Sequence, residues 1–430
     1  MTSFQTRSQG RLRVHVLSTR QFRTRHVSIR LSRPITRASV TATALLPYLW
    51  MEGTRQHPTA QALIRRADDL FGAVLRTGIS KRGDRHVAEV ALSVPDETGV
   101  GGLSGLFRDA WTLALSVMSD PMLDGAQFPV AHVQRERALH KRRIESIFDD
   151  KIAFAMERCL QELCSDGPAG LPRLGYLEDL AELDGAQLWT QHEALLQASE
   201  IHCYVIGDVD VEETADTLFT AFEHAVGTRG EGVFHPVDPL RPRAGDVRRV
   251  TDAQPVRQGK LDLGFRTGIS PRDAHYGALL VGNGVLGGFA HSKLFLNVRE
   301  EASLAYYASS RLDGLTGTVA VQTGIEVDNH QQALEIILAQ VKALQAGDIG
   351  VEELEFTRDG LRNQYHQVLD QPFGMADVHF TGVLAGVERD VTDLLRTVES
   401  VTREQVVEAA NAWHLDTIYF LRGQEVAARA

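Results

Sequence analysis

The feature that most constrains the fold of this chain is a repeated order of strands and helices on either side of one aperiodic stretch. Residues 1–226 begin with segments that alternate apolar and polar positions, continue with helical periodicity, and close on an apolar strand at about 202–210. Residues 248–430 repeat that order and close on a strand at 417–422. Strict alternation is typical of half-buried strands, and apolar residues three and four apart are typical of amphipathic helices. The sequence therefore predicts an α+β protein made of two homologous α/β-sandwich domains.

The stretch between the repeats, residues 227–247, is rich in Gly, Pro and Arg and has no period. Such a composition favours a linker. A chain of 430 residues is too long for one ordinary core, and it fits two domains of about 200 residues each. We therefore predict an N-terminal domain over 1–226, a linker over 227–247 and a C-terminal domain over 248–430.

The composition argues against several classes of protein. A formal net charge of −11 disfavours a nucleic acid as the main partner, and no run reaches the roughly 18 apolar residues that span a bilayer. The cysteines, Cys159, Cys164 and Cys203, make neither a disulfide framework nor a CxxC zinc pair. The Arg-rich start of the chain resembles a transit peptide, but its arginines alternate with apolar residues at strand spacing. We therefore predict a cytoplasmic protein with no membrane partner.

A long motif in the second half carries a family resemblance. Residues 284–306 read Gly-Val-Leu-Gly-Gly-Phe-Ala-His-Ser-Lys-Leu-Phe-Leu-Asn-Val-Arg-Glu-Glu-Ala-Ser-Leu-Ala-Tyr. Shorter matches stand at Met51-Glu-Gly-Thr54, Arg173-Leu-Gly175 and Gly207-Asp-Val-Asp210. Together these segments resemble the insulinase, pitrilysin and mitochondrial processing peptidase family over nearly the whole chain. The resemblance implies a clam-like pair of domains, with mixed and largely antiparallel sheets, that encloses a peptide or protein substrate.

The zinc-binding residues of that family are missing. Active members carry His-x-x-Glu-His before the Gly-Thr turn, where the histidines bind zinc and the glutamate activates water. Counting back from the turn at 53–54, these positions are Ala44, Leu45, Leu46, Pro47 and Tyr48. The family's third ligand is a glutamate on a later helix, and its position falls at Arg142 or Arg143, with Glu145 close in register. We therefore expect no metal, no cofactor and no autonomous peptidase activity.

The 16 histidines suggest no other metal site. His132 and His140 lie eight residues apart on one predicted helix, so they do not face one another as a pair four residues apart would. The remaining histidines are scattered singly along the chain. This pattern favours histidines that are exposed or bonded locally.

Two residues of the 284–306 motif match positions that have a role in the family. The resemblance implies that Arg299 holds a substrate carbonyl or carboxylate. It also implies that Tyr306 donates to the oxyanion of the tetrahedral intermediate. A plain structural interpretation stays open, in which Arg299 pairs with Glu300 or Glu301 and Tyr306 is a half-buried strand residue. Tyr307 is a competing candidate for the tyrosine role.

Two further segments have simpler interpretations. The glycines of the run, Gly282, Gly284, Gly287 and Gly288, lack phosphate-loop spacing. They favour a turn with close backbone approach, although contact with substrate, as in processing-peptidase subunits, stays open. Asp149-Asp150-Lys151 interrupts the predicted helix at 127–165 and is interpreted as a solvated turn.

Some members of the family act as two-chain enzymes, in which one chain carries the zinc motif and the other keeps the Arg and Tyr. The resemblance therefore implies a non-catalytic subunit that pairs with a zinc-motif-bearing homologous subunit, as a heterodimer or larger assembly. A second hypothesis is a non-proteolytic binding or scaffold protein, similar to a bacterial type associated with modification of translation elongation factor P. A third, a structural subunit of a respiratory membrane complex, is disfavoured by the absence of membrane-spanning segments.

Overall fold

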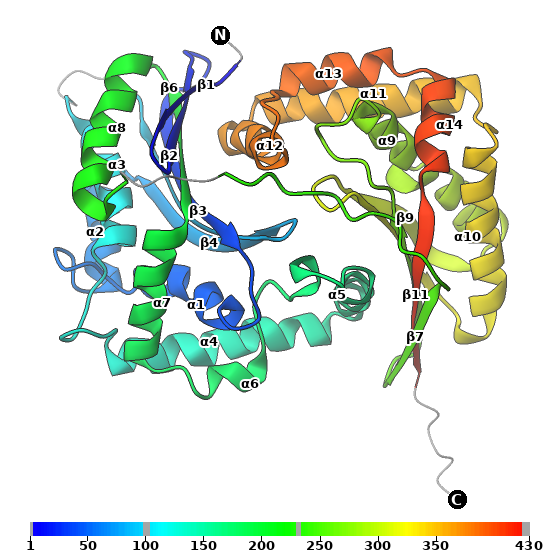
Figure 1. The fold of residues 1–430 in the computed structure, drawn as a ribbon, viewed down its shortest axis with the longest axis horizontal. Helices are drawn as coiled ribbons and strands as arrows, with labels where there is room; N and C mark the ends of the chain where they lie inside the picture. Colours follow the sequence, from blue (N-terminus) through cyan, green and yellow to red (C-terminus); the bar gives the residue numbers. More distant parts are fainter. Residues whose placement is uncertain (1–2, 98–103, 229–233, 424–430) are drawn as a thin grey trace, which may run out of the picture. The chain divides into compact units, whose positions relative to one another are not determined.

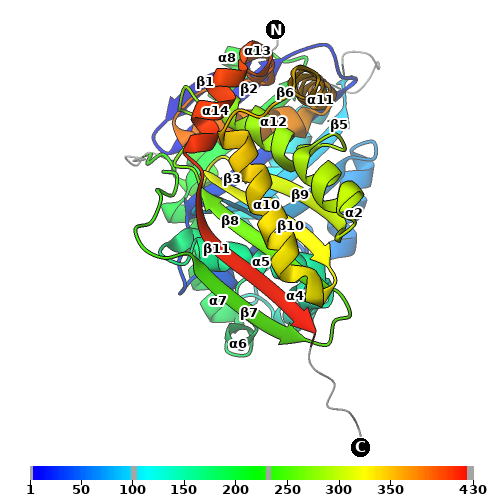
Figure 2. The ribbon, with the colours of Figure 1, turned by 90° about the vertical axis from the view of Figure 1, so that its right-hand side faces the viewer.

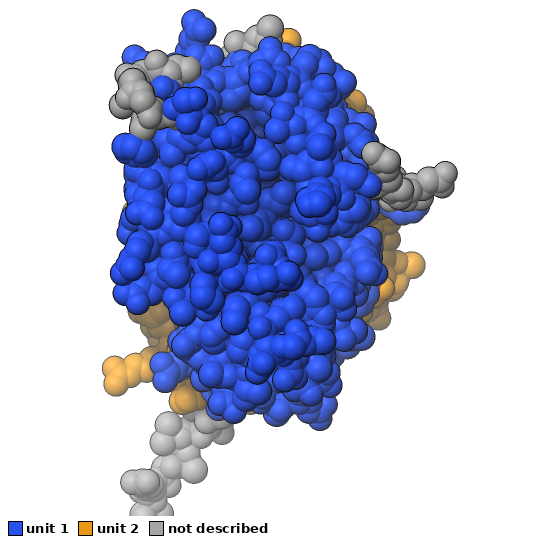
Figure 3. All heavy atoms as spheres, turned by 90° about the vertical axis from the view of Figure 1, so that its left-hand side faces the viewer, with its two compact units in different colours: residues 1–145, 171–235, 372–377 blue, residues 146–170, 236–371, 378–430 orange. Residues whose placement is uncertain are grey.

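The structure is a computed structural model that describes residues 3–97, 104–228 and 234–423, and it divides into two compact units (Figure 1). Unit 1 comprises residues 1–145, 171–235 and 372–377, and unit 2 comprises residues 146–170, 236–371 and 378–430. Figure 3 shows one face of unit 1. The units exchange segments that a single boundary in the sequence cannot separate, because residues 146–170 belong to unit 2 and residues 372–377 to unit 1. Residues 229–233 of the predicted linker lie outside the described part of the chain.

Unit 1 contains a six-stranded sheet in the order β1-β2-β6-β3-β5-β4. The strands are β1 (Gln5–Gln9), β2 (Leu12–Ser18), β3 (Thr24–Pro34), β4 (Val74–Arg82), β5 (Arg85–Pro95) and β6 (Glu200–Gly207). The β2–β6 pair is parallel, and the other neighbouring pairs are antiparallel. The predicted fold class, α+β with mixed and largely antiparallel sheets, is confirmed for this unit.

The helices of unit 1 cover the apolar face of its sheet. The helices are α1 (Val40–Trp50), α2 (Ala60–Asp69), α3 (Leu106–Ser119), α4 (Val130–Asp149), α6 (Leu177–Leu180), α7 (Gly185–Ala198) and α8 (Val211–Val226). Apolar positions such as Val14, Ile29 and Cys203 are paired in the β2–β6–β3 register and lie fully buried on one face. Alternate positions such as His15 and Arg30 lie on the other face. Helices α3, α7 and α8 pack against β2 and β3, and α1 packs against β4 and β5.

Unit 2 contains a five-stranded sheet in the order β7-β11-β8-β10-β9. The strands are β7 (Arg248–Gln254), β8 (Gly259–Arg266), β9 (Ala305–Asp313), β10 (Thr318–Ile325) and β11 (His414–Gly423). Figure 2 shows β7 beside β11, and this pair is parallel. The other neighbouring pairs are antiparallel, so the unit 2 sheet is also mixed and largely antiparallel.

The helical segments of unit 2 lie mainly against one face of its sheet. They are α5 (Lys151–Leu163), α9 (Tyr276–Asn283), α10 (His330–Gln345), α11 (Val351–Leu369), α13 (Val391–Ser400), α14 (Arg403–Asn411), the larger part of α12 (Pro372–Ala385), and two π-helical segments, η3 (Gly284–Gly288) and η4 (Phe295–Glu301). The core between the sheet and these helices includes Leu261, Leu263, Val319 and Val321 with Leu279, Val298 and Ile337. Within the described ranges, no helix is long and apolar enough to cross a membrane.

Helix α5 precedes the linker in sequence but packs on the sheet of unit 2. The predicted helix at 127–165 is interrupted at Asp150, whose side chain accepts hydrogen bonds from the backbone of Ile152 and Ala153 and so begins α5. Phe154 and Cys159 of α5 are buried against Tyr419 of β11. The predicted interruption at 149–151 is confirmed, and α5 belongs to unit 2, whereas the larger part of α4 belongs to unit 1.

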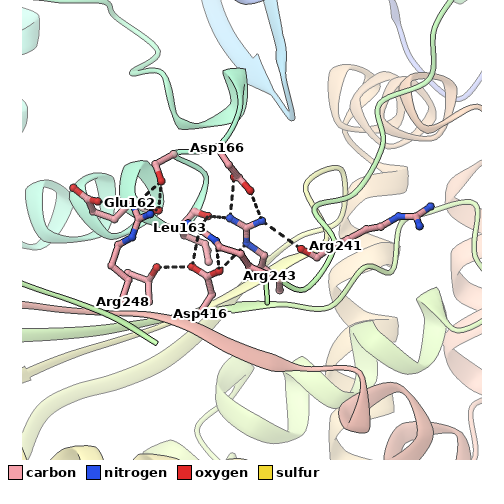
Figure 4. A network of polar contacts seen from close by, with 10 residues as sticks. Glu162, Leu163, Asp166, Arg241, Arg243, Arg248 and Asp416 are labelled. Carbon is pink, nitrogen blue, oxygen red and sulfur yellow. Dashed lines mark hydrogen bonds and ion pairs between the residues drawn. The ribbon is translucent and has the colours of Figure 1, made fainter. Parts of the chain in front are cut away.

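Three arginines hold the carboxyl end of α5 (Figure 4). Arg266 and Arg243 donate to the carbonyl of Leu163, and Arg248 donates to the carbonyl of Glu162. Asp416 accepts a hydrogen bond from Arg243 and forms an ion pair with Arg266, at 3.1 Å in each case. Cations stabilise the carbonyl end of a helix because its unpaired carbonyl groups carry partial negative charge. This network therefore fixes α5 to the sheet.

Several elements were not predicted. Strands β1, β4, β7 and β9 lie at sheet edges, where one side of the strand is unpaired and alternation of apolar residues is weak, as the mostly partly exposed residues of β4 and β9 show. Helices α12 and α13 were also missed. The segment after the glycine run forms the short π-helical η4, and α3 begins at Leu106.

Candidate functional site

Helix α1 carries the positions at which the zinc motif would stand. Ala44, Leu45 and Leu46 are fully buried, so they contribute to packing and offer no ligand atom. Pro47 lies inside the helix, where it has no backbone donor and no carboxylate to activate water. Its carbonyl accepts a hydrogen bond from the Thr77 hydroxyl at 2.5 Å. Tyr48 is therefore the one polar side chain among the five positions.

Tyr48 and the position of the third ligand do come together in the structure. The Arg143 guanidinium lies over the Tyr48 ring, with its central carbon 3.6 Å from the ring centroid. The same guanidinium pairs with the buried Glu136 carboxylate at 3.3 Å. Arg142 is exposed, and Glu145 pairs with Lys141 at 3.7 Å. Of the two arginines considered from the sequence, Arg143 thus occupies the place beside α1, and it makes a cation–π contact there.

The histidines near this place are bonded locally. The His140 ring donates to the carbonyl of Leu174 at 2.8 Å, and its centroid lies 6.1 Å from that of Tyr48. Burial lowers the pKa of His140 to about 4, so the ring is neutral at pH 7. His132 is only partly buried. In the part of the chain that the structure describes, no three His, Cys, Asp or Glu side chains are grouped as metal ligands, and the residues around Tyr48 do not fit a zinc ion.

The glycines of the 284–306 motif allow η3 to approach β9 and α11 closely. A Cβ atom on Gly287 would lie 2.4 Å from the backbone nitrogen of Ser310, and one on Gly284 would lie 2.6 Å from the Cγ2 of Thr357. Neither distance is tolerated without a shift of the neighbour. The interpretation of this run as a close backbone approach is therefore supported, and its effect is to position the strand that carries Tyr306.

Tyr306 lies at an irregular point of an edge strand. In the β9–β10 register, Ala305 pairs with Ile325 and Tyr307 pairs with Gly324, so Tyr306 is the extra residue of a β-bulge. Its side chain is 56% exposed. The phenol donates a hydrogen bond to the Glu326 carboxylate at 2.7 Å, and this bond raises the pKa of Tyr306. The side chain is thus more exposed than the half-buried strand residue considered from the sequence.

Arg299 lies at the end of η4 and also has a partner in its own segment. Its guanidinium lies over the Phe295 ring at 4.5 Å from the centroid, and its Nε is 3.6 Å from the Glu300 carboxylate. Among the described residues, no hydrogen bond or ion pair joins Arg299 to Tyr306. The pairing with Glu300 that was left open from the sequence is therefore observed.

Two contacts of the site were missed by sequence reasoning. Glu326 is 20 residues from Tyr306 and meets it only because β9 and β10 pair. An exposed glutamate after a strand gives no signal of such a role. Tyr307, the competing tyrosine, is half-buried, and its ring lies against Gly324, where an added Cβ would come within 2.5 Å. A glycine opposite an aromatic residue was the one available hint.

Comparisons with known proteins agree with a lost zinc site on a retained fold. The family profile described as the peptidase M16 inactive domain matches residues 182–361. A Bacillus subtilis protein described as a probable inactive metalloprotease, YmfF, is 35% identical over 422 residues, which cover 97% of each chain. The crystal structure of a conserved protein from Enterococcus faecalis V583 has a TM-score of 0.91 and 28% identity, over 98% of this chain and 99% of that one. A peptidase M16 inactive domain from Pseudomonas fluorescens shares the fold, with a TM-score of 0.79 and 18% identity over 98% of each chain. The chain therefore belongs to the M16 family of insulinase-type peptidases, as a member that lacks the zinc motif.

Proposed function

We propose that this chain is the non-catalytic subunit of an insulinase-type zinc peptidase and supplies Arg299 and Tyr306 to a zinc-bearing homologous partner. The observation that carries the proposal is the placement of Tyr306. Its exposed side chain stands at a bulge of an edge strand, and bulges next to functional sites re-aim a side chain. An exposed phenol at such a point is available to a ligand in a way that a core tyrosine is not.

The absence of the family's zinc ligands from α1 supports a partner that carries the metal. Tyr48 and Arg143 fill the place between α1 and α4 with a cation–π contact, and a guanidinium repels a metal cation. Hydrolysis through an activated water would therefore need a metal held by another chain. A phenol donor aimed at the developing oxyanion is the kind of group that a second chain can contribute, because its effect depends only on position.

The strand that carries Tyr306 also suits an extended peptide. Strand β9 is an edge of its sheet, beyond β10 in the order. An edge strand has free backbone donors and acceptors, and extended peptides bind by adding to such an edge. A peptide paired to β9 would run beside the Tyr306 side chain. This supports a peptide or unfolded protein segment as the ligand class.

The test is co-expression with a zinc-motif homologue, followed by purification of the complex and measurement of peptide turnover. Removing one oxyanion donor typically lowers kcat by about 10²–10³-fold, and we expect an effect of that order for Tyr306→Phe in the complex. The matched control is Tyr307→Phe, which removes the same atom from the adjacent residue and is expected to leave kcat unchanged. Arg299→Ala is expected to raise KM more than it lowers kcat, because Arg299 would position the substrate.

Two results would count against this proposal. One is the absence of any complex with a zinc-motif homologue. The other is a complex in which neither Tyr306→Phe nor Arg299→Ala changes the rate of peptide turnover.

A second candidate is a binding or scaffold protein of the same fold, such as one associated with elongation factor P modification. The observation that favours it is that both predicted substrate residues already have partners within the chain, Tyr306 with Glu326 and Arg299 with Glu300. Under this candidate, a protein ligand binds with a measurable Kd, but no zinc-bearing complex containing this chain cleaves peptides.

A further inference from the structure

A row of basic side chains crosses three strands at one end of the unit 1 sheet. Arg33 of β3 is directly opposite His86 of β5, and His86 is directly opposite Lys81 of β4. Residues directly opposite one another in antiparallel strands point to the same face, with their Cβ atoms about 4.5–5.5 Å apart. Basic residues in such positions repel one another unless an anion lies between them.

The loop that leads into α6 adds a third cation over this row. The His86 ring donates to the carbonyl of Arg173 at 2.9 Å, and Lys81 donates to the carbonyl of Leu171 at 2.9 Å. The Arg173 guanidinium turns back to the sheet and donates to the carbonyl of Ile79 at 3.2 Å. The loop at 171–173 is therefore held on the row by backbone carbonyl groups, and the Arg173 side chain is exposed beside it.

The charges on this row are all positive. Burial lowers the pKa of His86 to about 4, and the charges of Arg173, Lys81 and Arg33 lower it further, whereas no carboxylate acts on this ring. His86 is thus neutral at pH 7, because a fourth positive charge there would be strongly disfavoured. The row presents three cations around a neutral imidazole.

Arg33 shows most directly that a partner is missing. It is half-buried, its Nη1 is buried without a hydrogen-bond partner, and within the described ranges it makes no hydrogen bond or ion pair. Burial alone lowers the pKa of Arg33. Three residues earlier on the same strand, and on its other face, the buried Arg30 pairs with the carboxylates of Glu89 and Asp377. A buried donor without a partner usually marks the place of a water or an ion.

We propose that Arg33, Lys81 and Arg173 form a binding site for a small oxyanion, a phosphate or carboxylate group, above the ring of His86. The planar guanidinium of Arg33 suits two parallel hydrogen bonds to such a group. The ammonium of Lys81 supplies a compact charge from the neighbouring strand, and Arg173 closes the site from the loop. The site lies wholly within unit 1 and does not depend on the function of Tyr306.

The test measures the melting temperature and the binding heat of the full chain while inorganic phosphate or acetate replaces chloride at constant ionic strength. We expect a saturable rise of Tm with at least one of these anions. A stronger response to phosphate assigns the site to phosphate groups, and a stronger response to acetate assigns it to carboxylates.

Arg33→Gln should weaken the binding at least tenfold, and Lys81→Met should weaken it in the same direction. The Gln variant is expected to keep the circular dichroism spectrum and the Tm in chloride, because Arg33 has no partner to lose. The matched control is Arg20→Gln, since Arg20 is an exposed arginine of unit 1 that pairs with Asp208, and its removal should leave the binding unchanged. The proposal is overturned if neither anion gives a saturable shift, or if the Arg33→Gln variant responds as the wild type does.

Discussion

The two units differ in which of the family's motifs they keep: unit 1 lacks the zinc motif, and unit 2 keeps the 284–306 motif. In unit 1, the positions of the metal motif have become part of the packing of α1, and Tyr48 and Arg143 contact each other where ligands would stand. In unit 2, the glycines of the 284–306 motif still bring η3 against β9, and Tyr306 still projects from the strand that they position. The zinc ligands of the family act through single side-chain atoms, so other residues can stand at these positions of unit 1 without a change of the backbone. The motif of unit 2 is tied to the backbone, and its loss would disturb the sheet.

The largest difference between the units is expected under acid. Burial lowers the pKa to about 4 for His26, His86 and His140 and to about 3 for His192, all in unit 1. A folded-state pKa below the unfolded value of about 6.5 means that the unfolded chain binds more protons. The stability from these rings is complete above pH 6.5 and is lost as the pH falls toward 4, by about 1–3 kcal/mol for each ring.

In unit 2, burial also lowers the pKa of His291, but that ring is only partly buried. Hydrogen exchange followed by mass spectrometry between pH 7 and 4.5 should therefore show unit 1 opening before unit 2. Equal loss of protection from hydrogen exchange in both units would contradict the prediction that unit 1 is the more sensitive to acid.

The next largest effect is expected in the network that holds α5. Arg266 is 2% exposed and pairs with Asp166 and Asp416. Arg266→Met leaves the buried Asp416 carboxylate with only one of its two cations and removes the donor that lies nearer to the Leu163 carbonyl, and breaking a buried pair of this kind typically costs about 3–5 kcal/mol. The control is Arg272→Met, because the Arg272–Asp238 pair lies at the surface of the same unit and such pairs contribute about 0–1 kcal/mol. Urea denaturation measures both, and similar values for the two variants would contradict a buried anchor.

Two glycines test whether the 284–306 motif of unit 2 is held by close packing of its backbone. Gly287→Ala places a Cβ at 2.4 Å from the Ser310 nitrogen, and overpacking of this kind typically costs about 1–3 kcal/mol. Gly78 of β4 has no atom within 4 Å of such a Cβ, so Gly78→Ala should change the free energy of unfolding by less than about 1 kcal/mol. Thermal denaturation of the two variants gives the answer, and a harmless Gly287→Ala would mean that the motif is not held by packing.

The smallest expected effect is at the positions that correspond to the family's zinc site. Arg143→Met removes the contact with Tyr48 and leaves the buried Glu136 without this partner. The two losses together should cost about 1–2 kcal/mol. Tyr48→Leu removes the cation–π contact alone and should cost less. If the Arg143→Met variant is as stable as the wild type, the contact between Arg143 and Tyr48 contributes nothing to stability.

The sequence was informative where the signal was local and long. The alternation in β3 and β8, the helical periods of α10 and α11, and the 284–306 motif led to the fold class and to the family. Comparison with the family motif left Arg142 and Arg143 as alternatives for the third ligand position, and the structure places Arg143 beside α1. What could not be predicted depends on pairing between distant segments: the bulge at Tyr306 exists only in the register with β10, and Glu326 becomes its partner through the same pairing.

The exchange of segments was hidden for a related reason. The sequence of residues 146–170 does not show whether this helix packs on the sheet of unit 1, which precedes it, or on the sheet of unit 2, whose strands come later in the chain. The arginines that hold α5, Arg243, Arg248 and Arg266, lie about 80–100 residues further on and read locally as ordinary linker and strand residues.

The position of α5 has a consequence for how the chain is made. The ribosome releases α5 before strands β8 and β11 exist, so its apolar face, with Phe154 and Cys159, has to wait for the sheet that will cover it. A fragment that begins at β7 would have the converse defect, because the sheet residues Gly264 and Tyr419 would lose the helix that lies on them. Dissection of this protein at its linker should thus yield two aggregation-prone halves, and a fragment of unit 2 should become soluble only when residues 146–170 are supplied with it.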